Sequence, residues 1–563
     1  MRLSKLVKWT ALGLSTTMML SGCGSTGGSD SGQGNSDTSS GTSVAEGNGD
    51  STAEQGDKPT VTIALVPQSE MAVYDNSNYA INWVEEQTGI HMEFVLLPSS
   101  DARTKLNLML NDGSYPDVIL YGLNKQDMLT YAEEGIFIPI NDLYEQYGDN
   151  YKKLFEERPQ YEGAAYAPDG NMYGFLDVGE CYHCQAYPKL WYNTEWLQSM
   201  GLSMPETIDE FEQVLTAAKN SDYNGNGQAD EIPLTGAQQW DCMLEWYLMN
   251  SFIPVDKTTM SHVENGKIVF SADKDEFKEG LAWMHKLYEE GLIDPTAFSQ
   301  KADQMQQVIR FDQNLVFAYV ADHFAIGIDM EDRHMNEITT AMLPLEGPNG
   351  LRLQPHNDYV DSASSFNWFI TDNCKDPVSA FKLGDFLMGD EASMVGMFGE
   401  EGTYWGYLEE ETPSVIEGTM ARYWSNPSYS TDTESDYWGN IFWTGMQKDL
   451  AEFRASYTAI PEDMYAASSY EARLFEETTK LIPFFYEEYL PKNLYMEKED
   501  YETFTTIQTS LQEYIRMSMA QFITGELNLD SDWDSYVDTI NSYGLDTYLS
   551  LYQAAFDEYN ANN

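Results

Sequence analysis

Basic residues and cysteines are scarce in this chain of 563 residues. Lys and Arg together number 31 against 91 Asp and Glu, which gives a formal net charge of −60 at pH 7. A chain with this charge repels phosphate backbones, so we expect no nucleic acid among its partners. Five cysteines are too few for a fold held together by disulfides.

Long apolar runs are also missing beyond the first 20 residues, because no later segment reaches about 18 consecutive apolar residues. Hydrophobic residues still make up 42% of the chain and aromatic residues 13%, more than disordered acidic chains carry. We therefore expect a soluble, folded body. The length suits two to four domains of roughly 100–200 residues each.

The N-terminus has the organisation of a secretory signal. Arg2, Lys5 and Lys8 precede a short apolar stretch at 9–20, which is too short to span a bilayer. The sequence Leu-Ser-Gly-Cys that ends at Cys23 resembles the lipobox of bacterial lipoproteins. That resemblance implies cleavage before Cys23, a thioether-linked diacylglycerol on its thiol, palmitate as an acyl group of the lipid anchor, and anchoring on the extracellular face of the cell membrane. The alternative is an ordinary secretory signal with a chance cysteine.

Strand-like and helix-like segments alternate from residue 61 onward. Strands are expected at 61–66, 91–97, 117–121, 136–140, near 232, and at 315–320, 339–343 and 365–370. Helices are expected at 79–88, 102–110, 126–134, 195–200, 208–219, 240–250, 274–290, 472–489, 501–522 and 533–543. This alternation predicts an α/β fold with doubly wound sheets in two lobes and a helical C-terminal region.

Four stretches together resemble a known family: YPDVI at 115–119, WLQSMGL with PETIDEF at 196–211, DYNGNGQADEIPL at 222–234, and GLIDP at 291–295. With the lipobox, they resemble the large extracellular solute-binding lipoproteins of ABC importers (family 1 type), in the branch that binds alginate and other oligosaccharides. The resemblance implies a two-lobed, periplasmic-binding-protein-like (type II) α/β fold with hinge strands. It also implies a monomer that is not an enzyme, closes on an oligosaccharide and presents it to ABC permease subunits.

The same resemblance implies a division of the chain. Residues 1–22 are the signal peptide and 23–58 a lipid-anchored flexible linker of Gly, Ser and other small or polar residues. The first lobe is expected at 59–186 and 352–450, and the second at 187–351 and 451–563.

Residues 222–231 resemble the first part of an EF-hand loop. Oxygen-bearing side chains occupy positions 1, 3, 5 and 9, Gly227 is at position 6, and Pro233 replaces the usual Glu at position 12. In the related binding proteins this loop holds a structural calcium, so the resemblance implies the ligands Asp222, Asn224, Asn226, Gln228 (through its carbonyl), Asp230 and Glu231. The alternative is an Asn-Gly turn that binds no metal.

Cys181 and Cys184 form a C-x-x-C motif that is open to several interpretations. A structural disulfide or two buried thiols are favoured, and a redox pair or half a zinc site remain alternatives. The chain beyond residue 23 contains no G-x-S-x-G, H-E-x-x-H or P-loop motif that would indicate an enzyme.

Saccharide sites combine aromatic platforms with fixed hydrogen-bonding groups. At strand ends and in aromatic-rich loops we expect the solute-binding residues Trp240, Tyr319, Asp322, Trp368, Trp405, Trp438 and Trp443. Core packing is the alternative role for each aromatic residue, and a solvated surface carboxylate the alternative for Asp322. Alternative functions are a surface glycan-binding protein without a transporter, or a binding protein for peptides or other polar solutes.

Overall fold

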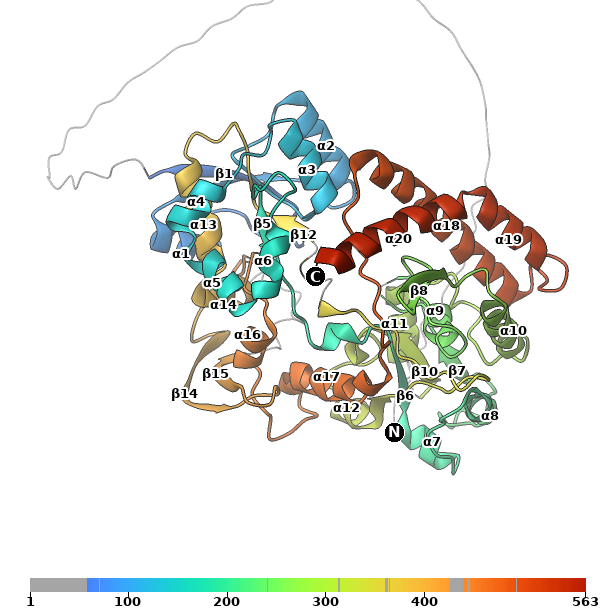
Figure 1. The fold of residues 1–563 in the computed structure, drawn as a ribbon. Helices are drawn as coiled ribbons and strands as arrows, with labels where there is room; N and C mark the ends of the chain where they lie inside the picture. Colours follow the sequence, from blue (N-terminus) through green and yellow to red (C-terminus); the bar gives the residue numbers. More distant parts are fainter. Residues whose placement is uncertain are drawn as a thin grey trace, which may run out of the picture. The chain divides into compact units, whose positions relative to one another are not determined.

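The computed structural model describes residues 58–562 except 70, 240, 312–313, 360–362, 364, 426–438, 443–445 and 493. Two four-stranded sheets, each covered by helices, dominate this part of the chain (Figure 1). In both sheets consecutive strands are joined through helices, which agrees with the predicted α/β alternation.

The first sheet has the strand order β13-β3-β1-β2. Its strands are β1 (Thr60–Leu65), β2 (His91–Leu96), β3 (Val118–Leu120) and β13 (Phe369–Ile370). β1 pairs in parallel with β2 and β3, whereas β13 is antiparallel to β3. Its helices are α1 (Tyr79–Thr88), α2 (Ala102–Asp112), α3 (Lys125–Glu133), α4 (Asn141–Tyr147), α5 (Asp149–Glu157), α6 (Pro159–Ala165), α13 (Pro377–Leu387), α14 (Asp390–Phe398) and α16 (Ala451–Ser456).

The second sheet has the strand order β11-β6-β10-β7. Its strands are β6 (Lys189–Asn193), β7 (Ile232–Thr235), β10 (Val316–Ala321) and β11 (Thr339–Ala341). β6 is antiparallel to β10 and β11, and β10 is parallel to β7. The helices are α7 (Thr194–Ser199), α8 (Ile208–Lys219), α9 (Leu244–Met249), α10 (Asp275–Glu289), α11 (Ala302–Phe311), α12 (Arg333–Ile338), α17 (Tyr470–Thr479), α18 (Lys498–Thr524), α19 (Trp533–Ser542) and α20 (Leu545–Asn562).

Three smaller sheets complete the described structure. One has the order β4-β12-β5, with β4 (Leu123–Asn124), β12 (Ser365–Asn367) and β5 (Phe175–Asp177). The others are the hairpins β8 (Ser261–Glu264) with β9 (Lys267–Phe270), and β14 (Trp405–Pro413) with β15 (Met420–Ser425).

The hydrophobic core is divided along the chain. One cluster draws its buried residues from 61–178 and 366–453. Two further clusters draw theirs from 186–345 and 474–556. The chain therefore passes between these two groups of core residues three times, within 178–186, 345–366 and 453–474.

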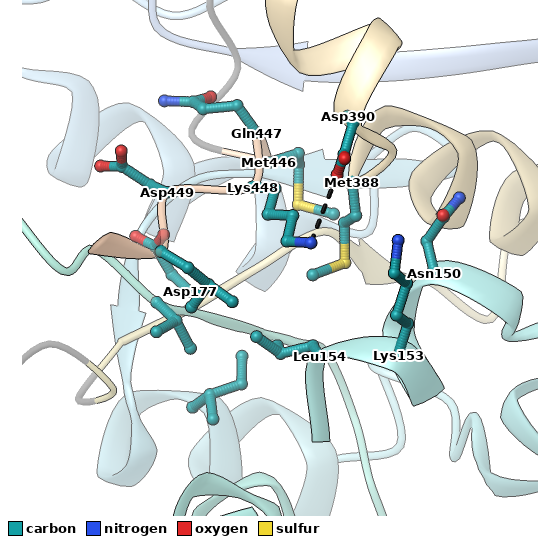
Figure 2. Close-up of a pocket in the computed structure, with 13 residues that line it drawn as sticks. Asn150, Lys153, Leu154, Asp177, Met388, Asp390, Met446, Gln447, Lys448 and Asp449 are labelled. Atoms are coloured by element: carbon teal, nitrogen blue, oxygen red, sulfur yellow. Dashed lines mark ion pairs between the residues drawn. The ribbon is translucent and has the colours of Figure 1, made fainter. Parts of the chain in front are cut away.

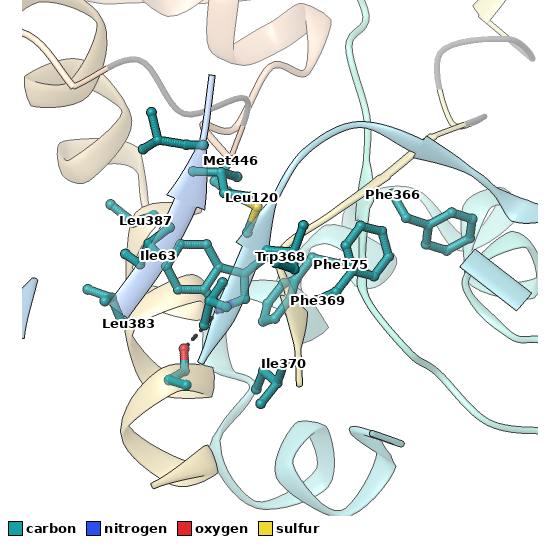
Figure 3. Packing of buried hydrophobic residues seen from close by; sticks show 14 of the residues in the cluster. Ile63, Leu120, Phe175, Phe366, Trp368, Phe369, Ile370, Leu383, Leu387 and Met446 are labelled. Carbon is teal, nitrogen blue, oxygen red and sulfur yellow. Dashed lines mark hydrogen bonds between the residues drawn. The ribbon is translucent and has the colours of Figure 1, made fainter. Parts of the chain in front are cut away.

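The expected strand at 365–370 is two strands in the structure. β12 belongs to the three-stranded sheet and β13 to the first sheet, and Trp368 lies between them with φ +57°. Its indole is fully buried against the first sheet and α13, and its Nε1 donates a 3.0 Å hydrogen bond to the Ala380 carbonyl (Figure 3). Packing on every side holds this uncommon backbone conformation.

The expected helix at 472–489 ends early. α17 stops at Thr479, and a single 3-10 turn follows at Ile482–Phe484. Pro483 explains why the helix does not continue, because proline lacks the N–H that a continuing helix needs. Among the helices of the described residues, none combines the length and apolar character needed to cross a membrane.

The close packing of α13 on Trp368 makes Gly384 sensitive to substitution. A Cβ there would lie 2.6–2.9 Å from three atoms of the indole ring. We expect Gly384→Ala to lower the free energy of unfolding by about 1–2 kcal/mol, since overpacking of about 1–3 kcal/mol exceeds the helix-propensity gain of at most about 1 kcal/mol. Urea titration measures the change.

Gly163→Ala is the matched control, because Gly163 lies in α6 and no atom lies within 4 Å of a Cβ built there. This variant should gain up to about 1 kcal/mol from propensity alone. Equal shifts for the two variants would contradict the packing assigned to Trp368.

Candidate functional site

A cavity of about 160 Å³ lies between four segments that are distant in sequence. Tyr187 and Pro188 precede β6, residues 241–257 surround α9, residues 355–357 come from a chain passage between the cores, and Tyr486 and Lys492 precede α18. Charged, aromatic and amide side chains all face it.

Two ion pairs fix the charged groups of this cavity. Lys257 pairs with Asp241, and Lys492 Nζ lies 3.0 Å from Asp256 Oδ2. Lys492 also donates a 2.5 Å hydrogen bond to Asn357 Oδ1. Burial, and then the charge of Lys492, lower the pKa of Lys257 to about 8 although Asp322 acts in the opposite direction. The site thus offers carboxylate acceptors and ammonium donors in fixed positions, with opposite charges paired.

Aromatic rings provide much of the remaining wall. Trp246 is 5% exposed, and the Tyr486 hydroxyl donates to Asn250 Oδ1. The His356 ring stacks on Phe485 with centroids 4.3 Å apart, and burial lowers the pKa of His356 to about 4. His356 is therefore neutral near pH 7. Flat rings beside fixed polar groups suit a ligand with both apolar faces and hydroxyl edges.

A layer of buried charged groups lies behind the cavity. Lys189 is fully buried, and its Nζ donates to the carbonyl oxygens of Ala186 (2.7 Å) and His183 (3.0 Å) and lies 4.8 Å from the Tyr187 ring centroid. Burial lowers the pKa of Lys189 to about 7, and the nearby Asp322 opposes that change. Burial raises the pKa of Asp322 to about 6.

The structure places one predicted solute residue beside this cavity. Asp322 follows β10, and its charge acts on both Tyr187 and Lys257, which line the cavity. Asp241, the neighbour of the predicted Trp240, lines the cavity directly. Trp240 itself lies outside the described residues, as do Cys23, Trp438 and Trp443.

The other predicted aromatic residues within the described part of the chain are buried, not exposed for contact with a solute. Trp368 and Trp405 are fully buried, and Trp405 Nε1 donates to the Gly399 carbonyl (2.9 Å). Tyr319 is 4% exposed, and its hydroxyl donates to the Phe324 carbonyl (2.9 Å). All three rings are enclosed by neighbouring side chains, so in this structure they have the packing role.

Sequence reasoning missed most residues of the cavity. Lys257, Lys492, Asp256 and Tyr486 occur in no recognisable motif and come together only through the fold. The one sequence signal was the aromatic-acid pair at residues 240–241, which lies three residues before the start of α9.

The loop at 222–231 closes on itself through the residues predicted to bind calcium. The Asp222 carboxylate accepts the Gly227 N–H (3.2 Å), and Asp230 accepts the Asn226 side-chain amide (3.0 Å). Glu231 is 7% exposed, and its Oε1 accepts the Tyr223 N–H (3.0 Å). Its Oε2 is buried and has no hydrogen-bond partner within the described part of the chain. Among the described residues these three carboxylates do not gather within 4.8 Å of one another, but oxygen ligands, one of them unpaired and buried, are of the type that a hard divalent cation takes.

Cys181 and Cys184 form a disulfide next to a passage between the cores. Paired sulfurs are not thiolate ligands, although the ligand atoms of Cys181, His183 and Cys184 lie within 4.8 Å of one another. His183 Nδ1 lies 3.1 Å from Glu471 Oε2 on α17. The segment that carries the disulfide is thereby joined to the second group of core residues.

A second, much smaller cavity of about 20 Å³ lies in the first group of elements (Figure 2). Lys448 reaches into it and pairs with Asp390 (3.3 Å), while Asp177 and Asp449 lie on the opposite side. Burial raises the pKa of Asp177 to about 6. This space holds about one water molecule, so in this conformation it is not a solute site by itself.

The chain belongs to the bacterial extracellular solute-binding protein family, whose sequence profile matches residues 68–394. Among its relatives, the fructooligosaccharide ABC transporter substrate-binding protein FusA of Streptococcus pneumoniae serotype 4 is 28% identical over 507 residues. The match covers 86% of this chain and 88% of FusA. Lipoprotein LipO of Bacillus subtilis is 26% identical over 363 residues, covering 62% of this chain and 64% of LipO.

The fold is that of two-lobed α/β solute-binding proteins. The structure of S. pneumoniae FusA in complex with kestose superposes with a TM-score of 0.74 at 25% identity, covering 90% of this chain and 100% of FusA. An EF-hand mutant of FusA in complex with fructo-nystose gives a TM-score of 0.73 at 25% identity, with the same coverage. The family and these relatives are substrate-binding proteins.

The raised pKa of Asp322 predicts a pH-dependent effect of Asp322→Asn. A carboxyl whose pKa is higher in the folded chain gives stability at low pH that is lost as the pH rises from about 4 through about 6. At 1.36 kcal/mol per unit, the cost of the ionised group above that range is up to about 3 kcal/mol. We expect Asp322→Asn to raise the free energy of unfolding at about pH 7.5 and to change it little at about pH 4, measured by urea titration.

Asp303→Asn on α11 is the control, because Asp303 is exposed and should show no such difference between the two pH values. An Asp322→Asn effect that is the same at both values would contradict the burial-driven shift.

Proposed function

We propose that this protein is the lipid-anchored, extracellular substrate-binding component of an ABC importer that captures oligosaccharides. The observation that carries the proposal is the similarity to FusA over most of both chains, at the level of sequence and of fold. The chemistry of the cavity supports it, because aromatic rings and paired charges suit sugar faces and hydroxyl groups.

The cavity is too small to enclose a whole oligosaccharide. About 160 Å³ is below the roughly 300–1,000 Å³ of sites that enclose a drug-sized ligand. The cavity therefore receives one end of an oligosaccharide, and the remainder extends beyond the residues that line it. The opposing surface comes from the first lobe when the protein closes.

The division of the core supports a hinge mechanism. We assign the first lobe to 59–186 and 352–456, which includes α16, and the second to 187–351 and 457–563, with the three chain passages between the cores as the hinge. Ligand binding favours the closed state by as much as its affinity for that state exceeds its affinity for the open one. Permease subunits recognise the closed, loaded form, and the sugar leaves chemically unchanged.

Membrane attachment rests on the sequence that ends at Cys23, and the similarity to a protein named as a lipoprotein supports it. Residues 1–22 are then the signal peptide, and 23–58 tether the monomeric body to the extracellular face of the membrane. Capture of peptides instead of sugars would give a different outcome in the binding experiment below.

We also assign a structural calcium to the loop at 222–231. Asp222, Asn224, Asn226, Asp230 and Glu231 supply side-chain oxygens, and Gln228 supplies its main-chain carbonyl. The unpaired Glu231 Oε2 supports this assignment, as does the EF-hand named for the mutant FusA. The ion would close the loop, which joins α8 to β7.

Substitution of the cavity charges tests the proposed solute site. Asp241→Asn keeps the size and the left-handed backbone (φ 52°) but removes the charge that pairs with Lys257. We expect this variant to bind kestose at least about tenfold more weakly by calorimetry, because hydrogen bonds to charged groups contribute about 1.5–3 kcal/mol.

Glu279→Gln, an exposed residue of α10, serves as the matched control and should bind as the parent does. The recovered sugar should be intact by chromatography, and its binding should reduce the radius of gyration in solution scattering. The sugar assignment is overturned if peptides bind and no member of an oligosaccharide panel that includes kestose does. Hydrolysed sugar would overturn the binding role.

Removal of calcium tests the loop assignment. A chelator should lower the melting temperature, and added calcium at about 100 times its Kd should restore about 2.7 kcal/mol of stability. The double variant Asp222→Asn with Asp230→Asn should lose most of this response, whereas Glu279→Gln should retain it. Identical melting with chelator and with calcium would refute a structural calcium here.

A further inference from the structure

A groove of about 660 Å³ runs along α11 on the second sheet. None of the described residues that line it is charged, although the chain as a whole carries a net charge of −60. Its volume lies within the roughly 300–1,000 Å³ of ligand sites in proteins.

One face of α11 forms most of the wall. Gln304, Gln307, Val308 and Phe311 follow the spacing i, i+3, i+4 and i+7, which puts them on the same side of the helix. The opposite side packs Ala302, Met305 and Ile309 into the core. The helix is therefore anchored by one face and presents the other to the groove.

The floor of the groove is fixed by Gln300, which is 7% exposed. Its Nε2 donates to the Gly236 carbonyl (2.7 Å) and to Thr235 Oγ1 (3.0 Å) at the end of β7. By contrast, the Gln307 side-chain amide makes no hydrogen bond to any described residue and faces the groove with both a donor and an acceptor.

Phe311 is 89% exposed at the end of this face. An exposed aromatic ring beside the free side-chain amide of Gln307 suits a ring with an apolar face and hydroxyl edges. A protein partner would more often meet a larger apolar centre, and a cationic one would be drawn to acidic side chains, which the described lining lacks.

We propose that this groove is a second binding site, for neutral saccharides, separate from the cavity. Phe311 and Leu315 precede β10, whereas Asp322 follows its other end beside the cavity. At about 3.3 Å per residue the six residues of β10 separate the two places by about 20 Å. The groove thus contacts a second sugar chain, or a distant part of a branched one, on the outside of the second lobe.

The experiment uses the full chain and a panel of neutral oligosaccharides: kestose, maltotriose and lacto-N-tetraose. Saturation-transfer NMR should detect binding in Asp241→Asn, in which the cavity is weakened. Adding Gln307→Ala and Phe311→Ser should weaken at least about tenfold the binding event that Asp241→Asn leaves unchanged, so that only the weakened cavity event remains. Both groove residues are exposed, so their replacement leaves the core intact.

Asp303→Asn, exposed on the same helix outside the groove, should leave the signal unchanged. Without the cavity substitution, the groove variant should lose only the weaker of two binding events. The proposal is overturned if Asp241→Asn shows no binding event besides the weakened cavity event, or shows one that the groove substitutions leave intact. Failure of Asp241→Asn to weaken the tighter event contradicts the cavity assignment alone.

Discussion

The buried ammonium of Lys189 holds together the region on which the candidate site depends. This residue starts β6, directly after a chain passage from the first core, and three carbonyl oxygens lie within 3.5 Å of its Nζ. Burial lowers the pKa of Lys189 to about 7, and the carbonyl oxygens of the segment at 183–188, which curls around this amine, offset part of the cost of burying its charge. That curl places Tyr187 against the cavity and the disulfide beside α17.

Charge burial also explains why the cavity consists of paired groups. Lys257 with Asp241 and Lys492 with Asp256 keep polar atoms in fixed positions while each charge is compensated. The partners come from segments far apart in the chain, so the site forms only when α9 and the segment before α18 are both in place. The proposed site thereby depends on the correct assembly of all these segments.

The alternation of strands and helices could be read from the sequence, because buried strands are continuous apolar runs and helices repeat every 3.6 residues. β1, α1 and α8 lie close to their expected ranges. The break at Trp368 could not be read in this way, since residues 365–370 are uniformly strand-like, and only pairing with two different sheets divides them. The burial of Trp368 and Trp405 could not be predicted either, because aromatic residues occur both in hydrophobic cores and in binding sites and the sequence alone does not distinguish the two.

By itself, the sequence predicted a lipoprotein-type N-terminus and a calcium-type loop and determined the α/β class, because each depends on residues close together in the chain. The tertiary structure alone decided which charged and aromatic side chains meet, since Tyr187, Asp241, His356 and Lys492 are separated by long stretches of chain. It also exposed the uncharged face of α11, which appears only when the other side of that helix is buried. Short motifs can be recognised from neighbouring residues, whereas a binding surface arises from packing between distant segments.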